Sequence, residues 1–369
     1  MVWHSMWLSI LMLCLISGYI LYKNPRFIGR SRSDDNISII VPARNEAHNL
    51  PKLLDSIQRQ RSVPLEVIVA DDGSTDDTRK IAEAAGATVI DVPEGEWQGK
   101  SHACHHGAQH ARYGTLVFMD ADTSFADDDS LSRINAQYQR QGGRGVLSIQ
   151  PFHQTERFHE TFSVIFNIVT VTGVNIFSAF GGRTQTSTVF GPFLITGRQD
   201  YAAAGGHANA RETIIEGMGI YSGYHEKGLP TTLYLGHGVL QFRMYPEGMS
   251  SVVKGWKKHI ASGAENAEGR VMALIMLWLC GTLIAPAYLI STAVWHFEAV
   301  LLPLISYSLY ALQFKWMGRR LIRLPWYSAF LYPIYSFFFF HVYGMSFIQT
   351  HVKKKIEWKG RKIELKKRK

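Results

Sequence analysis

The sequence predicts an α/β protein with a mainly parallel sheet covered on both faces by helices, joined to apolar helices at both ends of the chain. Three observations predict this architecture. Apolar strand-like runs alternate with amphipathic helical stretches between Ile37 and Gln150, which is typical of a parallel sheet. Several of those runs end in acidic or polar residues, at the sheet edge where such folds bind ligands. Finally, uncharged stretches long enough to cross a bilayer stand near both ends.

The hydrophobic period divides the alternating region into individual elements. The first predicted helix, for example, places Leu50, Leu53, Leu54 and Ile57 on one face. The predicted strands cover residues 37–41, 65–70, 88–91, 115–119, 145–149 and 231–235. The predicted helices cover residues 50–59, 76–85, 101–111 and 213–227.

The N-terminal stretch predicts a transmembrane anchor over residues 1–23. Residues 3–22 contain no charged side chain apart from His4, and Lys23, Arg26, Arg30 and Arg32 come directly after them. Positive residues after a membrane segment favour a cytoplasmic location for the chain beyond that segment. We therefore expect a cytoplasmic α/β domain over residues 34–262, in a multi-pass protein of the cell membrane.

Further apolar stretches predict membrane helices over residues 270–350. They cover residues 271–295, 300–314 and 326–347, and Pro333 interrupts the last one. Three and four spans both remain open, because Pro333 permits a re-entrant hairpin. Residues 161–180 are apolar with regularly spaced polar residues, which favours a helix lying in the membrane interface over a core or spanning helix.

The charge distribution argues against a nucleic-acid surface. The net charge is +9, but the basic tail at residues 351–369 holds ten Lys or Arg and two Glu, so the remainder is close to neutral at +1. A basic tail after an apolar segment indicates a cytoplasmic end that faces anionic lipid. The three cysteines are scattered, with neither a disulfide framework nor zinc-site spacing.

The acidic strand ends predict a site for a divalent cation. Asp120 and Asp122 follow the apolar run 116–119 and, in extended chain, project to the same side. Oxygen-only ligands suit Mg²⁺ or Mn²⁺. The alternative for the Asp-Ala-Asp string alone is a turn that caps a helix. No GxGxxG and no GxxxxGK[ST] is present, which disfavours dinucleotide and P-loop phosphate sites.

Four strings in order resemble the inverting glycosyltransferases of family 2, which have the nucleotide-diphospho-sugar (GT-A) fold. They are SIIVPARNE at 38–46, VIVADDGSTDDT at 67–78, GK at 99–100 and the Asp-x-Asp at 120–122. The resemblance implies that Asp122 and Asp120 hold the metal, with Asp120 on the metal or the ribose, and that Asp72, with Asp71 beside it, binds the uracil. It also implies that Pro42 and Glu46 line the ribose and base and that Lys100 neutralises phosphate. An exposed lysine at the start of a helix is an equally open interpretation of Lys100. Asp71 and Asp72 could equally form a turn that precedes a helix cap.

A longer resemblance, carried by strings at 99–111, 147–160, 243–248 and 357–361, covers nearly the whole chain. It points to the branch of the family that transfers glucose from UDP-glucose to the carboxylate of a C30 carotenoid acid. It implies a lipid-soluble acceptor in the membrane, and other carotenoid-pathway enzymes as further partners. Another membrane lipid acceptor (a polyprenyl phosphate, diacylglycerol or a sterol-like alcohol) and a catalytically silent scaffold are the alternatives.

One position departs from the family pattern. Members usually carry Glu-Asp on the helix after Gly-Gly, and that Asp is the general base, whereas this chain has Glu216-Gly217. Either Glu216 takes the role, or no base is needed because a carboxylic acid is already ionised at neutral pH.

Basic and aromatic residues downstream are candidates for contacts to the acceptor or the diphosphate. The interpretation of the same residues as a membrane-interface belt is equally open. These candidates are His207, Arg243, Trp256, Lys257, Lys258 and His259.

Overall fold

The structure is a computed structural model of the chain. It describes residues 2–61, 63–95, 97–181, 186–211, 213, 216–265, 268–348, 355–358 and 361–364. For residues 258–265 and for the two short C-terminal strands it describes the backbone alone. The rest of the basic tail lies outside the described residues.

The chain forms two compact units that alternate along the sequence. One unit comprises residues 1–25, 155–186 and 244–369, and the other comprises residues 26–154 and 187–243. The second unit contains the sheet and is called the sheet unit below. The first contains the long apolar helices and is called the helical unit.

The sheet unit is built on a seven-stranded sheet in which six strands point the same way. The strand order is β3-β2-β1-β4-β8-β6-β9, and only β8 runs antiparallel to its neighbours. This confirms the predicted mainly parallel sheet. The strands are β1 (Ile37–Ala43), β2 (Leu65–Asp71), β3 (Thr88–Asp91), β4 (Thr115–Met119), β6 (Val146–Gln150), β8 (Phe193–Gly197) and β9 (Thr231–Leu235).

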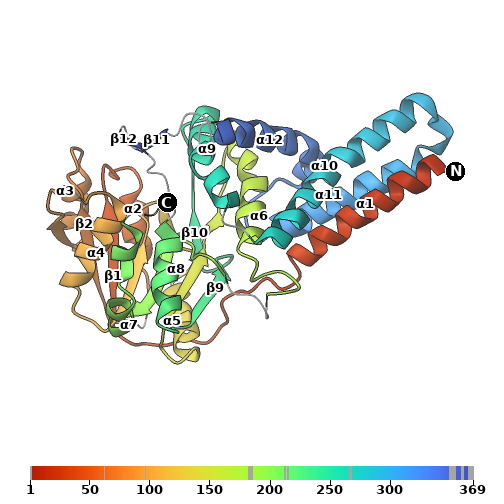
Figure 1. Cartoon of the computed structure of the whole chain (residues 1–369). Helices are drawn as coiled ribbons and strands as arrows, with labels where there is room; N and C mark the ends of the chain where they lie inside the picture. The colour runs from red at the N-terminus through yellow and green to blue at the C-terminus, as the bar shows by residue number, and fades with distance from the viewer. Residues whose placement is uncertain are drawn as a thin grey trace. The chain divides into compact units, whose positions relative to one another are not determined.

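Helices cover both faces of this sheet (Figure 1). Alternate residues of β1 and β4 enter the core under α2 and α5, while the residues between them face α4. On the α4 face the approach is close, because a Cβ at Gly107 would lie 2.5 Å from Ile40 Cγ2. The helices are α2 (Leu50–Gln58), α3 (Thr78–Ala84), α4 (Lys100–His110), α5 (Ser130–Arg140), α7 (Arg198–Ala203) and α8 (Glu216–Glu226), with the 3₁₀ helix η2 (Gly206–Ala210).

A second, three-stranded sheet completes this unit, in the order β5-β10-β7. Its strands are β5 (Thr123–Phe125), β7 (Phe152–His153) and β10 (Leu240–Phe242). β5 begins directly after Asp122, so pairing with β10 helps to fix the chain where the two acidic residues leave β4.

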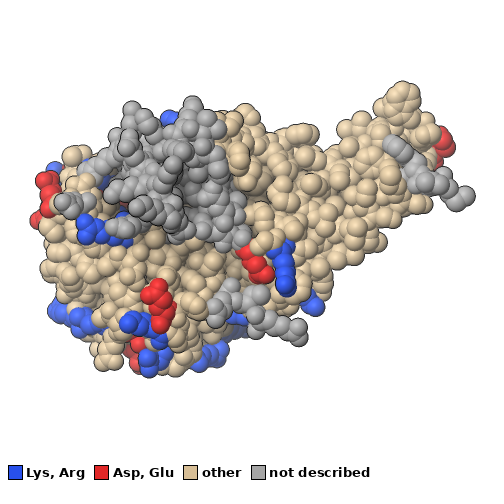
Figure 2. All heavy atoms as spheres, in the orientation of Figure 1, with Lys and Arg blue, Asp and Glu red and all other residues tan. Residues whose placement is uncertain are grey.

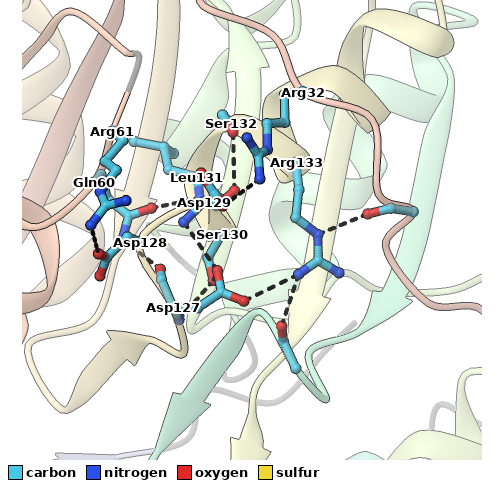
Figure 3. Close-up of polar contacts among 12 residues, drawn as sticks. Arg32, Gln60, Arg61, Asp127, Asp128, Asp129, Ser130, Leu131, Ser132 and Arg133 are labelled. Atoms are coloured by element: carbon cyan, nitrogen blue, oxygen red, sulfur yellow. Dashed lines mark hydrogen bonds and ion pairs between the residues drawn. The ribbon is translucent and has the colours of Figure 1, made fainter.

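A row of aspartates at the start of α5 holds the segment before β1 against the sheet unit (Figure 3). Asp129 pairs with Arg32 at 2.5 Å, Asp128 pairs with Arg61 at 3.0 Å, and Asp127 pairs with Arg133 at 3.3 Å. Arg133 also donates to the carbonyls of Gly29 and Gly238. Each aspartate pairs with a different arginine, so the role of this row is structural.

The helical unit contains a bundle of three long helices, α1 (Val2–Leu21), α10 (Gly269–Trp295) and α11 (Leu301–Gly318), which lie side by side (Figure 1). Gln313 joins all three inside the bundle: its Nε2 donates to Leu15 O at 2.6 Å, and its Oε1 accepts from Trp278 Nε1 at 3.1 Å. An amide with both ends satisfied stabilises helix association in apolar surroundings.

The remaining elements of the helical unit are shorter. They are η1 (Phe158–Ser163), α6 (Val164–Gly173), α9 (Met249–Glu265), η3 (Phe297–Ala299), η4 (Trp326–Leu331), α12 (Tyr332–Ile348), β11 (Lys355–Trp358) and β12 (Arg361–Glu364). Pro333 lies at the start of α12, where a proline needs no N–H partner, so it begins this helix.

Three helices in the described part of the chain are long and apolar enough to cross a membrane. They cover His4–Leu21, Gly269–Trp295 and Trp326–Ile348. Figure 2 shows that the visible face of α1, α10 and α11 is almost free of charged side chains. Large apolar residues such as Leu13, Ile290 and Leu312 are exposed there, which indicates membrane association.

The segment 161–180 is shorter as a helix than we expected. α6 ends at Gly173, and Asn175 follows with φ 62°, a left-handed conformation that terminates helices. Val164, Phe166 and Ile168 are fully buried, and α6 lies against α9, α10, α11 and α12. Its placement in the membrane interface stays a prediction.

Candidate active site

The sheet topology brings the acidic strand ends to one edge. β2, β1 and β4 are neighbours and parallel, with Ala43 opposite Asp71 and Ile40 opposite Phe118. Asp72 and Asp120 each follow the last residue of their strand. Both therefore lie at the carboxyl edge of the sheet, where open α/β folds bind ligands.

Lys100 is the centre of the charged group at this edge. Its Nζ lies 2.8 Å from Asp120 Oδ1 and 3.0 Å from Glu216 Oε2, and it donates to Gly191 O at 3.1 Å. Lys100 begins α4 after Gly99, whose φ of 93° suits glycine. Asp120 lies two residues after Phe118 and so projects toward the α4 face of the sheet. Lys100, at the start of α4, thus lies between two carboxylates that come from other segments of the chain.

Two neighbouring side chains, Lys100 and His207, favour the ionised form of Glu216. His207 Nε2 lies 3.2 Å from Glu216 Oε1, opposite the Lys100 contact. Burial alone would raise the pKa of Glu216, but Lys100 and then His207 lower it to about 2. A carboxylate that is already paired with a lysine has little affinity for a proton, so Glu216 is poorly suited to act as a general base at neutral pH.

Tyr201 fixes the orientation of His207. The tyrosine hydroxyl lies 2.9 Å from His207 Nδ1 and accepts the His207 backbone N–H at 3.2 Å. The ring also lies against Phe118 of β4, with centroids 4.5 Å apart. His207 Nε2 lies within ion-pair distance of Glu216 Oε1, an oxygen that accepts no hydrogen bond from the described residues. Tyr201 is therefore a positioning residue for the contact between His207 and Glu216.

Asp122 is in the opposite electrostatic situation. Burial, then the charges of Asp120 and Glu46, raise its pKa to about 7. Burial also raises the pKa of Asp120, against the pull of Lys100. Three carboxylates share this corner with one lysine, and that lysine also neutralises Glu216. Such an excess of half-buried carboxylates over cations fits a divalent cation.

Gly217 leaves no space for a side chain. A Cβ on this residue would lie 2.1 Å from Val189 O and 2.7 Å from Thr188 Oγ1. Val189 N also donates to Gly217 O at 3.1 Å, which fixes the two strands of chain against each other. A side chain at position 217, where the resemblance implies a base in other members, would thus collide with the backbone in this chain.

The turn after β2 is organised by Asp71, and Asp72 is the next residue of the chain. Asp71 Oδ1 accepts from Ser74 N at 2.9 Å. Arg44 donates to Asp72 O at 2.6 Å and lies 3.7 Å from Asp72 Oδ2. That oxygen is buried and accepts no hydrogen bond from the described residues. Asp72 thus has one acceptor position open for a ligand N–H.

Two more nucleotide-site predictions fall on the strand next to this turn. Pro42 lies in β1, opposite Ala70. Glu46 comes after the same strand and accepts from Asn49 at 2.8 Å. Both residues therefore lie at the same end of β1 as Asp72 and Asp120.

The predicted downstream candidates lie in different parts of the chain. Arg243 follows β10 at the end of the sheet unit, and Lys257 belongs to α9 in the helical unit. Trp256, also in α9, stacks on Phe166 at 4.8 Å and donates to Ser163 at 3.0 Å. The side chains of Lys258 and His259 lie outside the described residues. A role of these residues in acceptor or diphosphate binding stays a prediction.

Two members of the site, Tyr201 and Gly191, were not predicted from the sequence. Tyr201 belongs to a short helix without a recognisable spacing, and Gly191 contributes only a backbone carbonyl. The run FGPFLITG around Gly191 was a usable signal, because it contains the apolar strand β8 directly after two turn residues.

Comparison with known proteins identifies the family. Residues 38–199 match the model of "Glycosyl transferase family 2". The chain is 40% identical over 334 residues to 4,4'-diaponeurosporenoate glycosyltransferase from Staphylococcus aureus strain USA300, covering 90% of this chain and 89% of that protein. The protein of the same description from strain NCTC 8325 / PS 47 gives the same figures.

A solved structure shows the same fold. A mannosyltransferase from Pyrobaculum calidifontis, in complex with GDP-Man and Mn²⁺, matches with a TM-score of 0.51 at 18% identity, over 90% of this chain and 95% of that one. The chain therefore belongs to glycosyl transferase family 2 and is a glycosyltransferase with the GT-A fold.

Proposed function

We propose that the enzyme transfers glucose from UDP-glucose to the carboxylate of a lipid-soluble C30 carotenoid acid, and so forms a glucosyl ester. The name of the 40% identical relatives supports this acceptor. The observation that carries the proposal is that, among the residues that the structure describes, the proposed acceptor side has no side chain suited to act as a base. Glu216 is paired with Lys100 and His207, and Gly217 has no room for another acid.

The reaction on such an acceptor needs no base. A carboxylate oxygen attacks the anomeric carbon of glucose and forms the ester C–O bond. The bond from that carbon to the diphosphate breaks, and its electron pair leaves with UDP. A carboxylic acid is ionised at pH 7, so no proton has to be removed from it. An alcohol, by contrast, must lose a proton during attack.

The donor side fits a nucleotide diphosphate with its cation. Asp122 and Asp120 would hold Mg²⁺ or Mn²⁺, since their corner has more buried carboxylate than cation. When bound, this cation would neutralise charge on the departing diphosphate. Asp72 would accept the uracil N–H, with Asp71 shaping its turn and Pro42 and Glu46 beside the ribose. Lys100 would support Asp120 and face the phosphates.

The surroundings fit a membrane-bound acceptor. The helical unit has three apolar helices of spanning length, and we propose that the protein is multi-pass with its sheet unit in the cytoplasm. His207 would act through Glu216, which orients the donor sugar. Arg243, Trp256, Lys257, Lys258 and His259 would contact the acceptor or the diphosphate.

A second acceptor class follows from the same observation. A polyprenyl phosphate is also ionised at neutral pH and would likewise need no base. The alcohols diacylglycerol and sterol are disfavoured, because Glu216 is ion-paired with Lys100 and its pKa is lowered to about 2, so it would take up their proton poorly.

The test is incubation of the purified, membrane-embedded protein with UDP-glucose, Mn²⁺ and a panel of lipids, followed by mass analysis of the products. The panel contains the C30 carotenoid acid, its alcohol, a polyprenyl phosphate and diacylglycerol. We expect the glucosyl ester of the acid, and no product with Asp122→Ala. Transfer to an alcohol in preference to the acid would overturn the proposal.

A further inference from the structure

The segment from Trp326 to Ile348 is apolar and long enough to cross a bilayer. The side on which it ends decides how many times the chain crosses. Contacts inside the helical unit place both ends of this segment relative to the bundle of α1, α10 and α11. The bundle therefore provides the reference for the two sides of the membrane.

α11 runs along the whole length of this bundle. Its Trp316 stacks on Tyr19 near the end of α1, with ring centroids 6.1 Å apart. At the other end, the ring of His296, between α10 and α11, lies 6.4 Å from that of His4. Residues 301–314 contain no charged side chain. The 18 residues of α11 measure about 27 Å, close to the thickness of the hydrocarbon core, about 30 Å. These dimensions fit a helix that crosses together with α1 and α10.

One end of the bundle is joined to the sheet unit and carries the positive residues. α1 leads through Lys23 into the sheet unit, which begins at residue 26. Lys315 and Arg319 lie at the same end, where α11 stops. Residues 1–8 and 294–306, at the opposite end, contain neither Lys nor Arg. Such an asymmetry is typical of a membrane protein whose positive end faces the cytoplasm. The end at Lys23 is called the sheet-side end below.

The segment 326–348 begins at the sheet-side end. Three residues before it, the backbone carbonyl of Arg323 accepts a hydrogen bond from Thr155 Oγ1 at 2.6 Å. Thr155 directly follows residue 154, the last residue of one part of the sheet unit. Trp326 and Tyr327 are exposed, and these residue types are enriched where membrane and water meet. The segment therefore starts in the interface on the sheet side.

The middle of the segment reaches about halfway along α11. The Tyr307 hydroxyl donates to the carbonyl of Phe330, and the ring centroids of Tyr307 and Tyr332 lie 4.9 Å apart. Tyr307 comes 11 residues before Gly318, the last residue of α11, which corresponds to a depth of about 16 Å. Ser328 is fully buried. A turn of the chain at this depth has to be covered by protein with its carbonyls satisfied, and both conditions are met here.

α12 then leads back to the sheet side. Figure 1 shows it beside α9, near the end of the bundle opposite to the N-terminus. Ser346, close to the end of α12, donates to the carbonyl of Lys257 in α9 at 2.6 Å. α9 follows the part of the sheet unit that ends at residue 243 and precedes the start of α10, whose far end lies beside His4. Both ends of α9 are therefore on the sheet side, and the end of α12 is as well.

We propose that Trp326–Ile348 is a re-entrant hairpin, which enters the sheet-side leaflet and leaves it on the same side, so that the chain crosses the bilayer three times, with α1, α10 and α11. The partner of its outer face is the acyl chains of that leaflet. This face consists of Trp326, Phe330, Ile334 and Phe337, which are large and exposed. The basic C-terminus then stays on the same side as Lys23 and Arg319, as its charge requires. The inference does not depend on which acceptor the enzyme uses.

The test is labelling of single added cysteines in the full-length protein with a membrane-impermeant maleimide, in intact and in permeabilised protoplasts. Glu298→Cys reports on the turn between α10 and α11, Asp55→Cys on the sheet unit, and a cysteine appended after Lys369 on the C-terminus. Glu298 and Asp55 have exposed side chains, so their replacement should not affect folding. The wild type, whose cysteines are Cys14, Cys104 and Cys280, provides the background.

We expect Glu298→Cys to be labelled in intact protoplasts. Asp55→Cys and the appended cysteine should be labelled only after permeabilisation. Labelling of the appended cysteine together with Glu298→Cys in intact protoplasts would overturn the hairpin, because the segment would then cross the bilayer. Labelling of Glu298→Cys only after permeabilisation, as for Asp55→Cys, would overturn the crossing of α10 and α11.

The same experiment separates this inference from the proposed location of the sheet unit. If Asp55→Cys and the appended cysteine were both labelled in intact protoplasts, and Glu298→Cys only after permeabilisation, the hairpin would stand. The cytoplasmic location of the sheet unit would then be wrong.

Discussion

Asp122 and Glu216 are two carboxylates of the same sheet edge with opposite proton affinities. The pKa of Asp122 is raised to about 7, and that of Glu216 is lowered to about 2. Both are half-buried, so burial alone does not explain the difference. Glu216 has Lys100 and His207 beside it, whereas Asp122 has further acids, Asp120 and Glu46, as neighbours.

The difference shows which of the two acids the protein neutralises with its own side chains. The acid at Glu216 has already received its cation from the chain. The corner at Asp122 is suited to a cation that arrives from solution with the nucleotide. We therefore propose that the same chemical group has a structural task at Glu216 and a ligand-binding task at Asp122.

The largest effect is expected for Asp122→Asn, which removes one negative charge from the proposed donor side of the site. Loss of one charged ligand should lower kcat/KM by about a thousandfold and weaken Mn²⁺ binding in the presence of UDP. Steady-state rates and calorimetric titration of Mn²⁺ measure both. Asp55→Asn is the control, because Asp55 is exposed on α2 and pairs only with Arg59 one turn away. Unchanged Mn²⁺ affinity in Asp122→Asn would contradict the donor-side assignment.

A smaller effect is expected for Gly217→Ala, which tests whether the acceptor side has room for another group. The new Cβ would collide with Val189 O, and overpacking of this kind costs about 1–3 kcal/mol. The melting temperature in detergent should fall by several degrees. Gly114→Ala should show no such fall, since a Cβ there meets nothing within 4 Å and its φ is not positive. An unchanged melting temperature for Gly217→Ala would show that the backbone at Val189 can move to make room for a side chain.

The smallest effect is expected for Glu216→Gln with the acid acceptor. If Glu216 is an anchor for Lys100, the rate should fall by less than about tenfold, the scale of one ion pair. The pH profile at saturating metal should stay flat between pH 6 and 8 in both proteins. A several-hundredfold loss, or a new dependence on pH, would show that Glu216 is a base after all.

The stability of the same variant has a defined pH dependence. The folded-state pKa of Glu216 lies below its unfolded value near 4.3. Its contribution to the free energy of unfolding is therefore present above about pH 4.5 and lost as the pH falls toward 2. Glu216→Gln should lack this part of the acid destabilisation, as followed by thermal unfolding at pH 3 to 5.

Most of the sheet could be predicted because its strands alternate regularly with amphipathic helices. The predicted boundaries at 88–91, 115–119 and 231–235 are those observed. β8 was missed, because Phe193–Gly197 is a short apolar run that inserts antiparallel between strands distant in sequence. α5 was missed as well, since SLSRINAQYQR is predominantly polar, and several of the residues that it buries are polar too, such as Ser130, Ser132 and Asn135.

The site was predicted where a strand end carries the chemistry. Asp120, Lys100 and Glu216 were each identified from the sequence, and the structure places them within one ion-paired group. The sequence could not show that Lys100 is shared between two acids, because this depends on how α4 and α8 meet. Nor could it indicate Tyr201, whose neighbours come from segments without a strand-end pattern.

The order in which the two units use the chain limits how this protein can be divided. The polypeptide passes between the units at residues 25–26, 154–155, 186–187 and 243–244. A soluble fragment cut at residues 26 and 243 would retain residues 155–186 without the helices that bury Val164, Phe166 and Ile168. Such a fragment would expose an apolar segment and aggregate. Production of the catalytic half by truncation therefore requires replacing that internal segment with a polar linker.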